Sequence, residues 1–263
     1  MFDLHTHILP GIDDGAKDMD TALTMLRMAA EQGTTALALT PHFIEGDWLP
    51  DWEEIVAGCQ RLQAAAQEHN IPLQLYPGAE IAIHYDNLDR LKGPGPYCFN
   101  GGSYALVELP ATHIPSFIDE FLFVLQARGI NPIIAHAERH PEIARKPDIL
   151  LEWVRKGVLV QMNAPSLTGR MGEKTQAAAE FLLTNHLVHI IGSDGHGINF
   201  RRPQMNRAAR RMMELVGHEQ TQRILTTNPA AILQDRTLDV PIPERIQTSR
   251  DGFLRRMKGY LWG

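Results

Sequence analysis

The sequence has few cysteines, no long apolar run and no excess of basic residues, and each absence excludes a class of protein. Its two cysteines, Cys59 and Cys98, show no spacing typical of a metal or redox motif, so a disulfide framework is not expected. Cysteine-dependent phosphatases need a Cys-x5-Arg loop to activate the thiolate. Here Ala65 and Tyr104 stand where the arginine would be, which excludes that class.

The charge balance and the lack of targeting segments argue against three further classes: nucleic-acid binders, membrane-spanning proteins and secreted proteins. The formal net charge is −6, whereas a general nucleic-acid binder needs a clustered basic surface. The 44% hydrophobic and 21% charged content is ordinary for a globular protein with a core. No apolar stretch approaches the roughly 20 residues needed to span a bilayer. The N-terminus lacks the basic region and apolar run of a secretory signal, so we expect a cytoplasmic protein.

Short apolar runs alternate with longer amphipathic segments along most of the chain. Strands are predicted at about 2–7, 35–40, 73–80, 104–108, 131–136, 158–163 and 188–194. Helices are predicted at about 19–32, 51–69, 115–128, 141–156, 173–185, 204–216, 218–225 and 229–234. This alternation predicts parallel strands joined by helical crossovers.

No internal repeat or low-complexity linker divides the chain. We therefore expect a single domain over residues 1–235, followed by a C-terminal extension over 236–263. Two connections, 43–50 and 81–103, are long, and long loops in a compact domain are often functional.

Polar side chains close or follow the predicted strands. In chain order they are His5, His7, Asp14, His42, Glu80, Glu108, His136, Asn163, Asp194 and His196. A doubly wound open sheet would gather such groups mainly at one crevice, whereas a parallel barrel brings all strand ends to one rim. Their spread over the predicted strands favours the barrel. Imidazole and carboxylate ligands together suit Mn, Fe, Zn or Mg, so the pattern predicts a hydrolase with a multinuclear metal centre.

An extended opening and five later motifs occur in a fixed order. The opening runs from Asp3 to Gly15, and the later motifs are Thr40-Pro41-His42, Gly78-Ala79-Glu80, Val107-Glu108, Ala135-His136-Ala137-Glu138-Arg139 and Ser193-Asp194-Gly195-His196. Together they resemble the PHP (polymerase and histidinol phosphatase) superfamily, specifically its bacterial capsule-type tyrosine phosphatases, the CpsB/CapC family. The resemblance extends to about residue 233, and residues 240–263 depart from it.

The resemblance implies a fold, a metal content and a ligand set. The fold would be a distorted seven-stranded TIM-like (β/α)7 barrel of the PHP type, holding three divalent ions, most often Mn, with Fe, Zn or Mg as alternatives. The implied ligands are His5, His7, Asp14, His42, Glu80, Glu108, His136, Asp194 and His196. Asp13 adjoins Asp14 and is its alternative, while Glu80 is the candidate bridge between ions. Arg139 and Arg201 are implied to bind phosphate, and Arg202 competes for the second role.

We expect a metal-bridging hydroxide to attack phosphorus in line, with no phosphoenzyme. By resemblance, the substrate would be phosphotyrosine on a bacterial tyrosine kinase that controls capsule or exopolysaccharide synthesis. One alternative is a small-molecule phosphomonoesterase such as a histidinol phosphatase, and a PHP nuclease is disfavoured by the acidic balance. The other alternative is a non-catalytic metal-binding regulatory module.

Four smaller features remain, three of them with two interpretations. Phe43, Trp48, Tyr85, Tyr97 and Phe99 either border a site for a phenyl ring or simply pack the long loops. Asp3 either supports the ligands or makes a plain core contact, and Asn163 is expected to bond at the rim. The basic amphipathic segment 241–263 meets an acidic membrane or a partner, or docks on its own barrel or on a neighbouring subunit of an oligomer.

Overall fold

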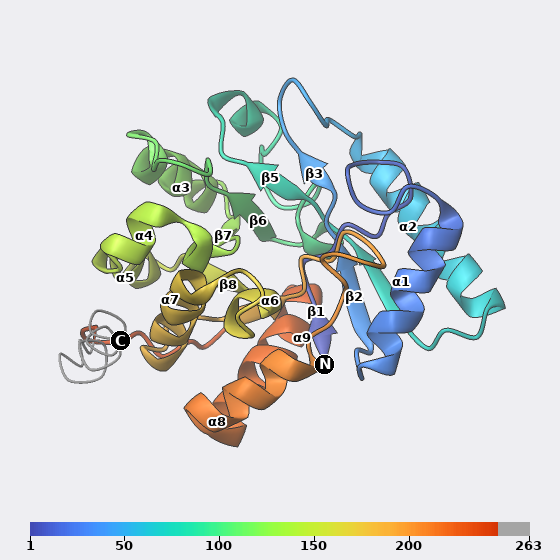
Figure 1. Ribbon diagram of the computed structural model, residues 1–263. Helices are drawn as coiled ribbons and strands as arrows, with labels where there is room; N and C mark the ends of the chain where they lie inside the picture. Colours follow the sequence, from blue (N-terminus) through green and yellow to red (C-terminus); the bar gives the residue numbers. More distant parts are fainter. Residues whose placement is uncertain (247–263) are drawn as a thin grey trace.

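The computed structural model describes residues 1–246 and shows an α/β fold in which helices surround a curled parallel sheet (Figure 1). The strands are β1 (Phe2–Asp3), β2 (Ala36–Leu39), β3 (His42–Phe43), β4 (Gln74–Pro77), β5 (Glu80–Ala82), β6 (Tyr104–Glu108), β7 (Asn131–Ile134), β8 (Leu159–Asn163) and β9 (Ile190–Gly192). They form a three-stranded sheet, β1-β2-β4, and a six-stranded sheet, β3-β5-β6-β7-β8-β9. Every strand pairing is parallel, so the predicted α/β class and strand direction are confirmed.

The count of seven strands in one barrel is not confirmed, because the strand predicted at 35–40 is followed by a separate strand, β3, and the strand predicted at 73–80 is interrupted. Thr40 and Pro41 separate β2 from β3, and Gly78 and Ala79 separate β4 from β5. Pro41 has no N–H to donate to a ladder, and a Cβ at Gly78 would lie 3.2 Å from the Phe99 ring. At each interruption the chain passes from the three-stranded to the six-stranded sheet.

A short segment after β1 joins the two sheets on their other side. A single parallel bridge links Thr6 to Gly195, beyond the end of β9. The N–H of Thr40 donates to Thr6 O at 2.9 Å, and the N–H of Asp194 donates to His5 O at 2.8 Å. Residues 5–7 therefore lie between β2 and the chain that follows β9.

Helices cover the outside of the sheets (Figure 1). They are α1 (Met19–Glu31), α2 (Trp52–Glu68), α3 (Ile118–Ala127), α4 (Pro141–Arg145), α5 (Asp148–Arg155), α6 (Ala164–Leu167), α7 (Glu173–Thr184), α8 (Asn206–Gln222) and α9 (Asn228–Leu233). The single helix predicted over 141–156 is two helices, because Lys146, which precedes Pro147, adopts φ −134° and ψ 72°. The helices predicted at 204–216 and 218–225 run together as α8, which is kinked at Gly217 with φ 76°.

The inner face of the curled sheet changes from apolar to polar along the strands. Alternate residues of a strand point to opposite faces, so each strand contributes one inward column. The columns begin with buried apolar residues: Tyr104, Leu106, Leu159 and Ile190. These belong to a small apolar cluster that also includes Ile232 and Leu233 of α9. They continue toward the carboxyl ends with Glu108, Gln161, Asn163 and Asp194. Polar groups are thereby collected at one end of the fold.

The chain after α9 continues along the body of the protein. Asp235 accepts a hydrogen bond from Ser103 N at 2.7 Å, and Leu238 and Val240 pack against the small apolar cluster. The division between 1–235 and 236–263 stays a prediction. Most of the segment predicted to be amphipathic, from residue 247 to the end, lies outside the described residues. Within residues 1–246, the helices are too short or too polar to cross a membrane.

Candidate metal centre

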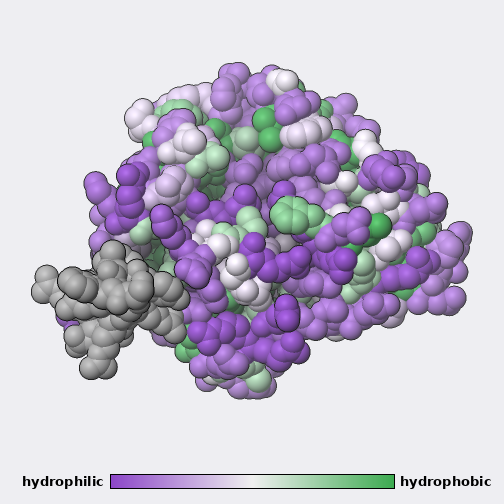
Figure 2. Space-filling view, in the orientation of Figure 1, coloured by the Kyte–Doolittle hydropathy of each residue, from purple (hydrophilic) through white to green (hydrophobic). Residues whose placement is uncertain are grey.

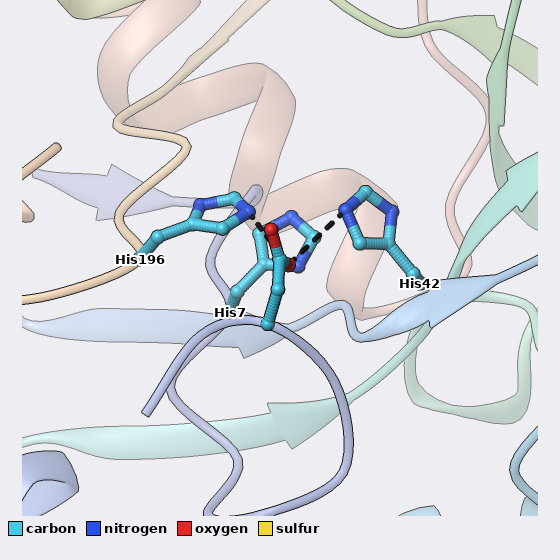
Figure 3. A group of neighbouring side chains, drawn as sticks. His7, His42 and His196 are labelled. Atoms are coloured by element: carbon cyan, nitrogen blue, oxygen red, sulfur yellow. Dashed lines mark ion pairs between the residues drawn. The ribbon is translucent and has the colours of Figure 1, made fainter. Parts of the chain in front are cut away.

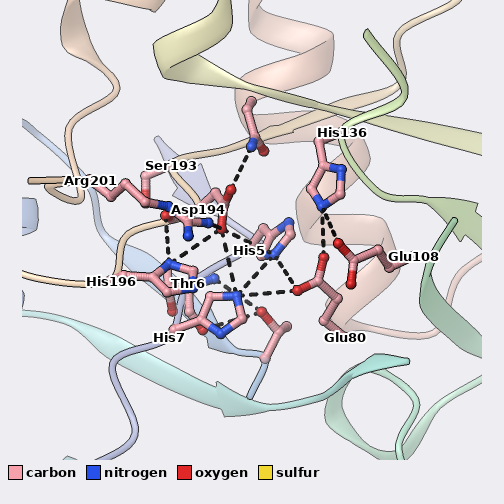
Figure 4. Close-up of polar contacts among 12 residues, drawn as sticks. His5, Thr6, His7, Glu80, Glu108, His136, Ser193, Asp194, His196 and Arg201 are labelled. Carbon is pink, nitrogen blue, oxygen red and sulfur yellow. Dashed lines mark hydrogen bonds and ion pairs between the residues drawn. The ribbon is translucent and has the colours of Figure 1, made fainter. Parts of the chain in front are cut away.

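The nine residues predicted as ligands lie together at one end of the sheets, and Figure 4 labels all of them except Asp14 and His42. Two follow β1 (His5, His7), one lies in the loop before α1 (Asp14), two begin β3 and β5 (His42, Glu80), one ends β6 (Glu108), one follows β7 (His136) and two follow β9 (Asp194, His196). Each contacts another member of the set at 3.7 Å or less, so the group is continuous.

The most deeply buried part contains two histidines and two carboxylates. The Nε2 atoms of His5 and His7 are 3.2 Å apart. Glu80 Oε2 lies 3.2 Å from the first and 3.3 Å from the second. Asp194 Oδ1 lies 3.7 Å and 3.6 Å from the same two atoms. All four side chains are at most 3% exposed, so the group is shielded from water.

A second group is formed by Asp14 with His42 and His196, the two histidines being labelled in Figure 3. Asp14 Oδ1 lies 3.5 Å from His42 Nε2 and 3.3 Å from His196 Nε2. The Nδ1–H of His196 donates to the backbone oxygen of Asp194 at 3.0 Å, so its Nε2 carries no hydrogen when the ring is neutral. Burial and the nearby charge of His7 lower the pKa of His196 to about 3. Its Nε2 is a buried atom without a hydrogen-bond partner in the described chain.

Glu80 connects these groups to a third. Its Oε1 lies 2.9 Å from His136 Nε2, which is also 3.3 Å from Glu108 Oε1. Its Oε2 lies 3.1 Å from His42 Nδ1. Burial alone would raise the pKa of Glu80, but the surrounding histidines, His5 foremost, hold it well below its ordinary value. Glu80 is therefore an ionised carboxylate that uses both oxygens.

Hydrogen-bond acceptors behind His5 and His7 determine which ring nitrogen carries the hydrogen. Asp13 Oδ2 lies 2.7 Å from His7 Nδ1, and Gln161 Oε1 lies 3.2 Å from His5 Nδ1. Both oxygens accept, so both Nδ1 atoms donate, and the Nε2 lone pairs face each other. Burial would lower the pKa of His7, but its bonds to Asp13 and Glu80 raise it to about 10. A proton or a metal ion must occupy the space between these nitrogens.

The spacing of the donors fits a shared ion. Donors bound at about 2.1 Å to one ion lie roughly 3.0–3.4 Å from one another. Three sets of donor atoms lie within 4.8 Å of one another: His7, Asp14, His42 and His196; His5, His7 and Glu80; and His42, Glu80 and Glu108. The residues present therefore fit more than one divalent cation.

Two of the three candidate arginines contact the centre. Arg139 donates to Asp194 Oδ2 at 3.1 Å, and Arg201 donates to Asp194 Oδ1. Their side chains are 35% and 26% exposed, so each guanidinium also faces solvent. Arg202 instead donates from Nε to the backbone oxygen of Asn199 at 3.2 Å. The structure thus brings Arg139 and Arg201, rather than Arg202, to Asp194.

Supporting residues surround the predicted ligands, and sequence reasoning found only some of them. Asp13 accepts from His42 N at 3.1 Å and from Gly15 N at 3.0 Å in addition to His7. Asp3 accepts from Ser193 N at 2.9 Å and from His5 N at 3.3 Å. Asn163, expected to bond at the rim, ends β8 and donates to Asp194 Oδ2 at 2.7 Å, with its side chain fully buried. Gln161 was missed, although a polar residue inside an apolar strand, two before Asn163, was an available signal.

The backbone adopts unusual conformations at the centre. His136, Asp194 and Arg201 have φ values of 31°, 54° and 50°, in the left-handed region that non-glycine residues rarely enter. Such conformations cost on the order of 1–3 kcal/mol each and persist only where surrounding contacts enforce them. His136 stands just after β7, and Asp194 and Arg201 stand in the segment after β9.

The aromatic residues of the long loops mostly pack. Phe43 and Phe99 are 1% exposed, and the Phe43 ring packs on Tyr97 with centroids 4.5 Å apart. Trp48 differs, because its ring stacks on His42 at 5.3 Å.

In the view of Figure 2, hydrophilic side chains surround a hollow near the middle of the face.

The fold and the cluster together define a class: an α/β protein with a centre of histidines and carboxylates at the carboxyl ends of a curled parallel sheet. The family profile described as "Capsular polysaccharide synthesis, CpsB/CapC" matches residues 1–234. This chain belongs to the CpsB/CapC family, as its motifs predicted.

Similarity to individual proteins extends over nearly the whole chain. It is 31% identical over 247 residues to the tyrosine-protein phosphatase YwqE of Bacillus subtilis, covering 94% of this chain and 97% of that protein. It is 27% identical over 243 residues to the tyrosine-protein phosphatase CpsB of Streptococcus pneumoniae, covering 90% and 100%. A solved structure from work on YwqE and CpsB, described as unique metal-dependent tyrosine phosphatases, matches with a TM-score of 0.87 and 30% identity, covering 94% and 100%.

Proposed function

We propose that this protein is a metal-dependent protein-tyrosine phosphatase that acts in the cytoplasm, with residues 1–235 as its catalytic domain. Family membership supports the reaction class, since the relatives that match nearly the full chain are named tyrosine-protein phosphatases. The carrying observation is the pair of Nε2 atoms of His5 and His7, which face each other at 3.2 Å with both Nδ1 hydrogens directed elsewhere.

The proposed centre holds three divalent ions, with Mn the first choice. The proposed ligands are the nine residues named above, with Glu80 bridging ions because it presents a different oxygen to each side. Asp14, Glu80, Glu108 and Asp194 carry four negative charges against six positive charges from three ions. The remainder favours an anionic substrate such as a phosphate monoester.

The chemistry then divides between cations and side chains. Divalent ions at such a centre lower the pKa of bound water and neutralise charge on a phosphoryl group. Arg139 and Arg201 bind the phosphoryl oxygens, for which the planar, five-donor guanidinium is suited. A cysteine nucleophile is excluded, because burial raises the pKa values of Cys59 and Cys98 to about 12. A phenolate leaving group, with a pKa of about 10, needs less protonation than an alkoxide.

The proposed substrate is a phosphotyrosyl protein, specifically a bacterial tyrosine kinase that controls capsule or exopolysaccharide synthesis. The capsule link rests on the description of the family. Trp48, which stacks on His42 beside the centre, is the aromatic residue best placed to meet the phenyl ring of phosphotyrosine.

A metal-replacement assay tests the proposal. The protein is stripped with EDTA, restored with Mn, Mg or Zn singly, and assayed on p-nitrophenyl phosphate, a phosphotyrosyl peptide and histidinol phosphate. We expect activity to vanish with the metal, to return best with Mn, and to favour the phosphotyrosyl peptide. Hydrolysis that survives complete metal removal would refute the reaction class, and a strong preference for histidinol phosphate would refute the substrate.

A further inference from the structure

Strand β8 contributes no predicted ligand, yet its inner column ends in two polar side chains that are fully buried. Gln161 and Asn163 bond to each other, with Gln161 Nε2 donating to Asn163 Oδ1 at 2.9 Å. A buried amide is costly unless its donors and acceptors are satisfied. Their other hydrogen-bond partners include residues of the metal centre.

The side-chain oxygen of Gln161 holds two parts of the centre at once. Gln161 Oε1 accepts from His136 N at 2.7 Å and lies 3.2 Å from His5 Nδ1. A backbone N–H is always a donor, so the atom facing it must be the oxygen and not the amide nitrogen. His5 Nδ1 therefore carries the hydrogen, and its Nε2 is left free for a cation.

Little room exists for a different arrangement around Gln161. Its Nε2 also donates to Met162 O at 2.8 Å, which prevents the amide from turning over without loss of bonds. A Cβ at Gly192 would lie 2.5 Å from His5 Cβ and 3.0 Å from Gln161 Nε2, so β9 passes very close to both. The His5 ring and the amide are held in one packed unit.

Asn163 acts in the same way on a carboxylate. Its Nδ2 donates to Asp194 Oδ2 at 2.7 Å, which leaves Oδ1 as the oxygen nearer to His5 and His7. The backbone of Asn163 is itself held, because its N–H donates to Glu138 Oε1 at 3.1 Å. Glu138 also accepts from Ser166 Oγ at 2.6 Å, so the end of β8 is attached to the start of α6.

We infer that Gln161 and Asn163 are positioning residues that fix the tautomer of His5 and the orientation of Asp194 for cation binding. The inference rests on the proposed function, since it concerns the same centre. Groups that orient metal ligands in this way typically change metal affinity or activity about 10–100-fold when removed.

The test compares Gln161→Met with Gln63→Met in the full-length chain. Gln63 is a matched control, because it is partly buried and bonds to Leu73 O at 3.0 Å and to Leu75 N at 2.8 Å, in α2 and remote from the centre. Mn affinity is measured by electron paramagnetic resonance of free Mn. The His5 tautomer is read from ¹⁵N spectra of histidine-labelled, metal-free protein at alkaline pH, assigned with His5→Gln.

We expect Gln161→Met to weaken Mn binding about 10–100-fold and to shift His5 away from the Nδ1–H tautomer, while Gln63→Met alters stability alone. Equal Mn affinity in Gln161→Met and the unsubstituted protein, or an unchanged His5 tautomer, would overturn the inference. If Gln161→Met does not fold, Asn163→Leu takes its place and is expected to weaken Mn binding. Unchanged Mn binding in Asn163→Leu would contradict the inference. An unsubstituted protein that binds none of Mn, Mg and Zn would instead refute the proposed function.

Discussion

The carboxylate of Asp13 lies 2.7 Å from Nδ1 of His7 and holds that ring from behind. The adjacent Asp14 points the other way, toward His42 and His196. Two consecutive acids thus have different tasks, one supporting a ligand and the other serving as a candidate ligand.

Substitution of each acid by asparagine separates these tasks. Asp13 accepts from Gly15 N on one oxygen and from His42 N on the other. In Asp13→Asn the amide NH2 replaces one of these oxygens, so two donors face each other. We expect Mn affinity to fall about 10–100-fold with all ligands retained. Asp14→Asn should also reduce the number of ions bound, as measured by metal analysis after dialysis. Equal metal content and affinity in both variants would contradict the assignment.

Metal binding should release protons and strengthen as the pH rises. Bonds to Asp13 and Glu80 raise the pKa of His7 to about 10 despite its burial, and bonds to Glu108 and Glu80 do the same for His136. Without metal, both histidines hold protons at neutral pH, and a cation must displace them. Calorimetry in buffers of different ionisation enthalpy measures this release. Affinity that is constant between about pH 6 and pH 9 would argue against it.

The two arginines at Asp194 should matter more than their neighbour. Arg139→Lys and Arg201→Lys keep the charge but lose the planar fork, and removal of a donor that stabilises transition-state charge typically costs about 100-fold in rate. We expect losses of that order in kcat/KM on p-nitrophenyl phosphate, without loss of Mn. Arg202→Lys is the matched control and should stay close to the unsubstituted rate. A larger effect at Arg202 would reverse the assignment.

Thiol reagents should leave catalysis unaffected. Cys59 and Cys98 are buried, and burial raises the pKa of both to about 12, so neither is a thiolate at neutral pH. Iodoacetamide is expected to leave kcat/KM unchanged under conditions in which EDTA abolishes it. Inactivation by iodoacetamide that phosphate prevents would point to a cysteine in the chemistry.

His189 should reduce the stability of the fold in acid. Burial lowers its pKa from the ordinary 6.5 to about 4. The unfolded chain therefore binds its proton first, and stability falls as the pH drops from about 6.5 to about 4, by up to about 3 kcal/mol. His189→Asn keeps an acceptor for Val160 N, now 3.0 Å from Nδ1, and should flatten that dependence in denaturant unfolding with EDTA. The same change at exposed His218 should leave the slope intact.

Much of this fold was predictable from the alternation of short apolar and longer amphipathic segments. The break at Gly78 was not, because whether a strand continues past a glycine depends on what packs there, here the Phe99 ring. Lys146 and Pro147 show the opposite case. Proline disfavours a helical conformation at the residue before it, so the break at Lys146 could have been predicted from the sequence.

The candidate site was predictable in its members and much less so in their arrangement. His42 and Glu80 were expected at strand ends, but the structure makes them the first residues of β3 and β5, paired in register, while Glu108 ends the neighbouring β6. The part played by Gln161 depends on its rotamer and on the left-handed turn at His136, neither of which leaves a local pattern. The same holds for Asp13, whose direction depends in part on the backbone amide of His42, distant in the chain.

Residues 5–7 form the seam between the two sheets, held by the bridge from Thr6 to Gly195 and by backbone hydrogen bonds on both sides. Any ion shared by His5, His7 and Glu80 would connect this thin strip directly to β5, in the larger sheet. The cations would then link residues 5–7 to the larger sheet, so removal of metal would destabilise the fold as well as abolish activity.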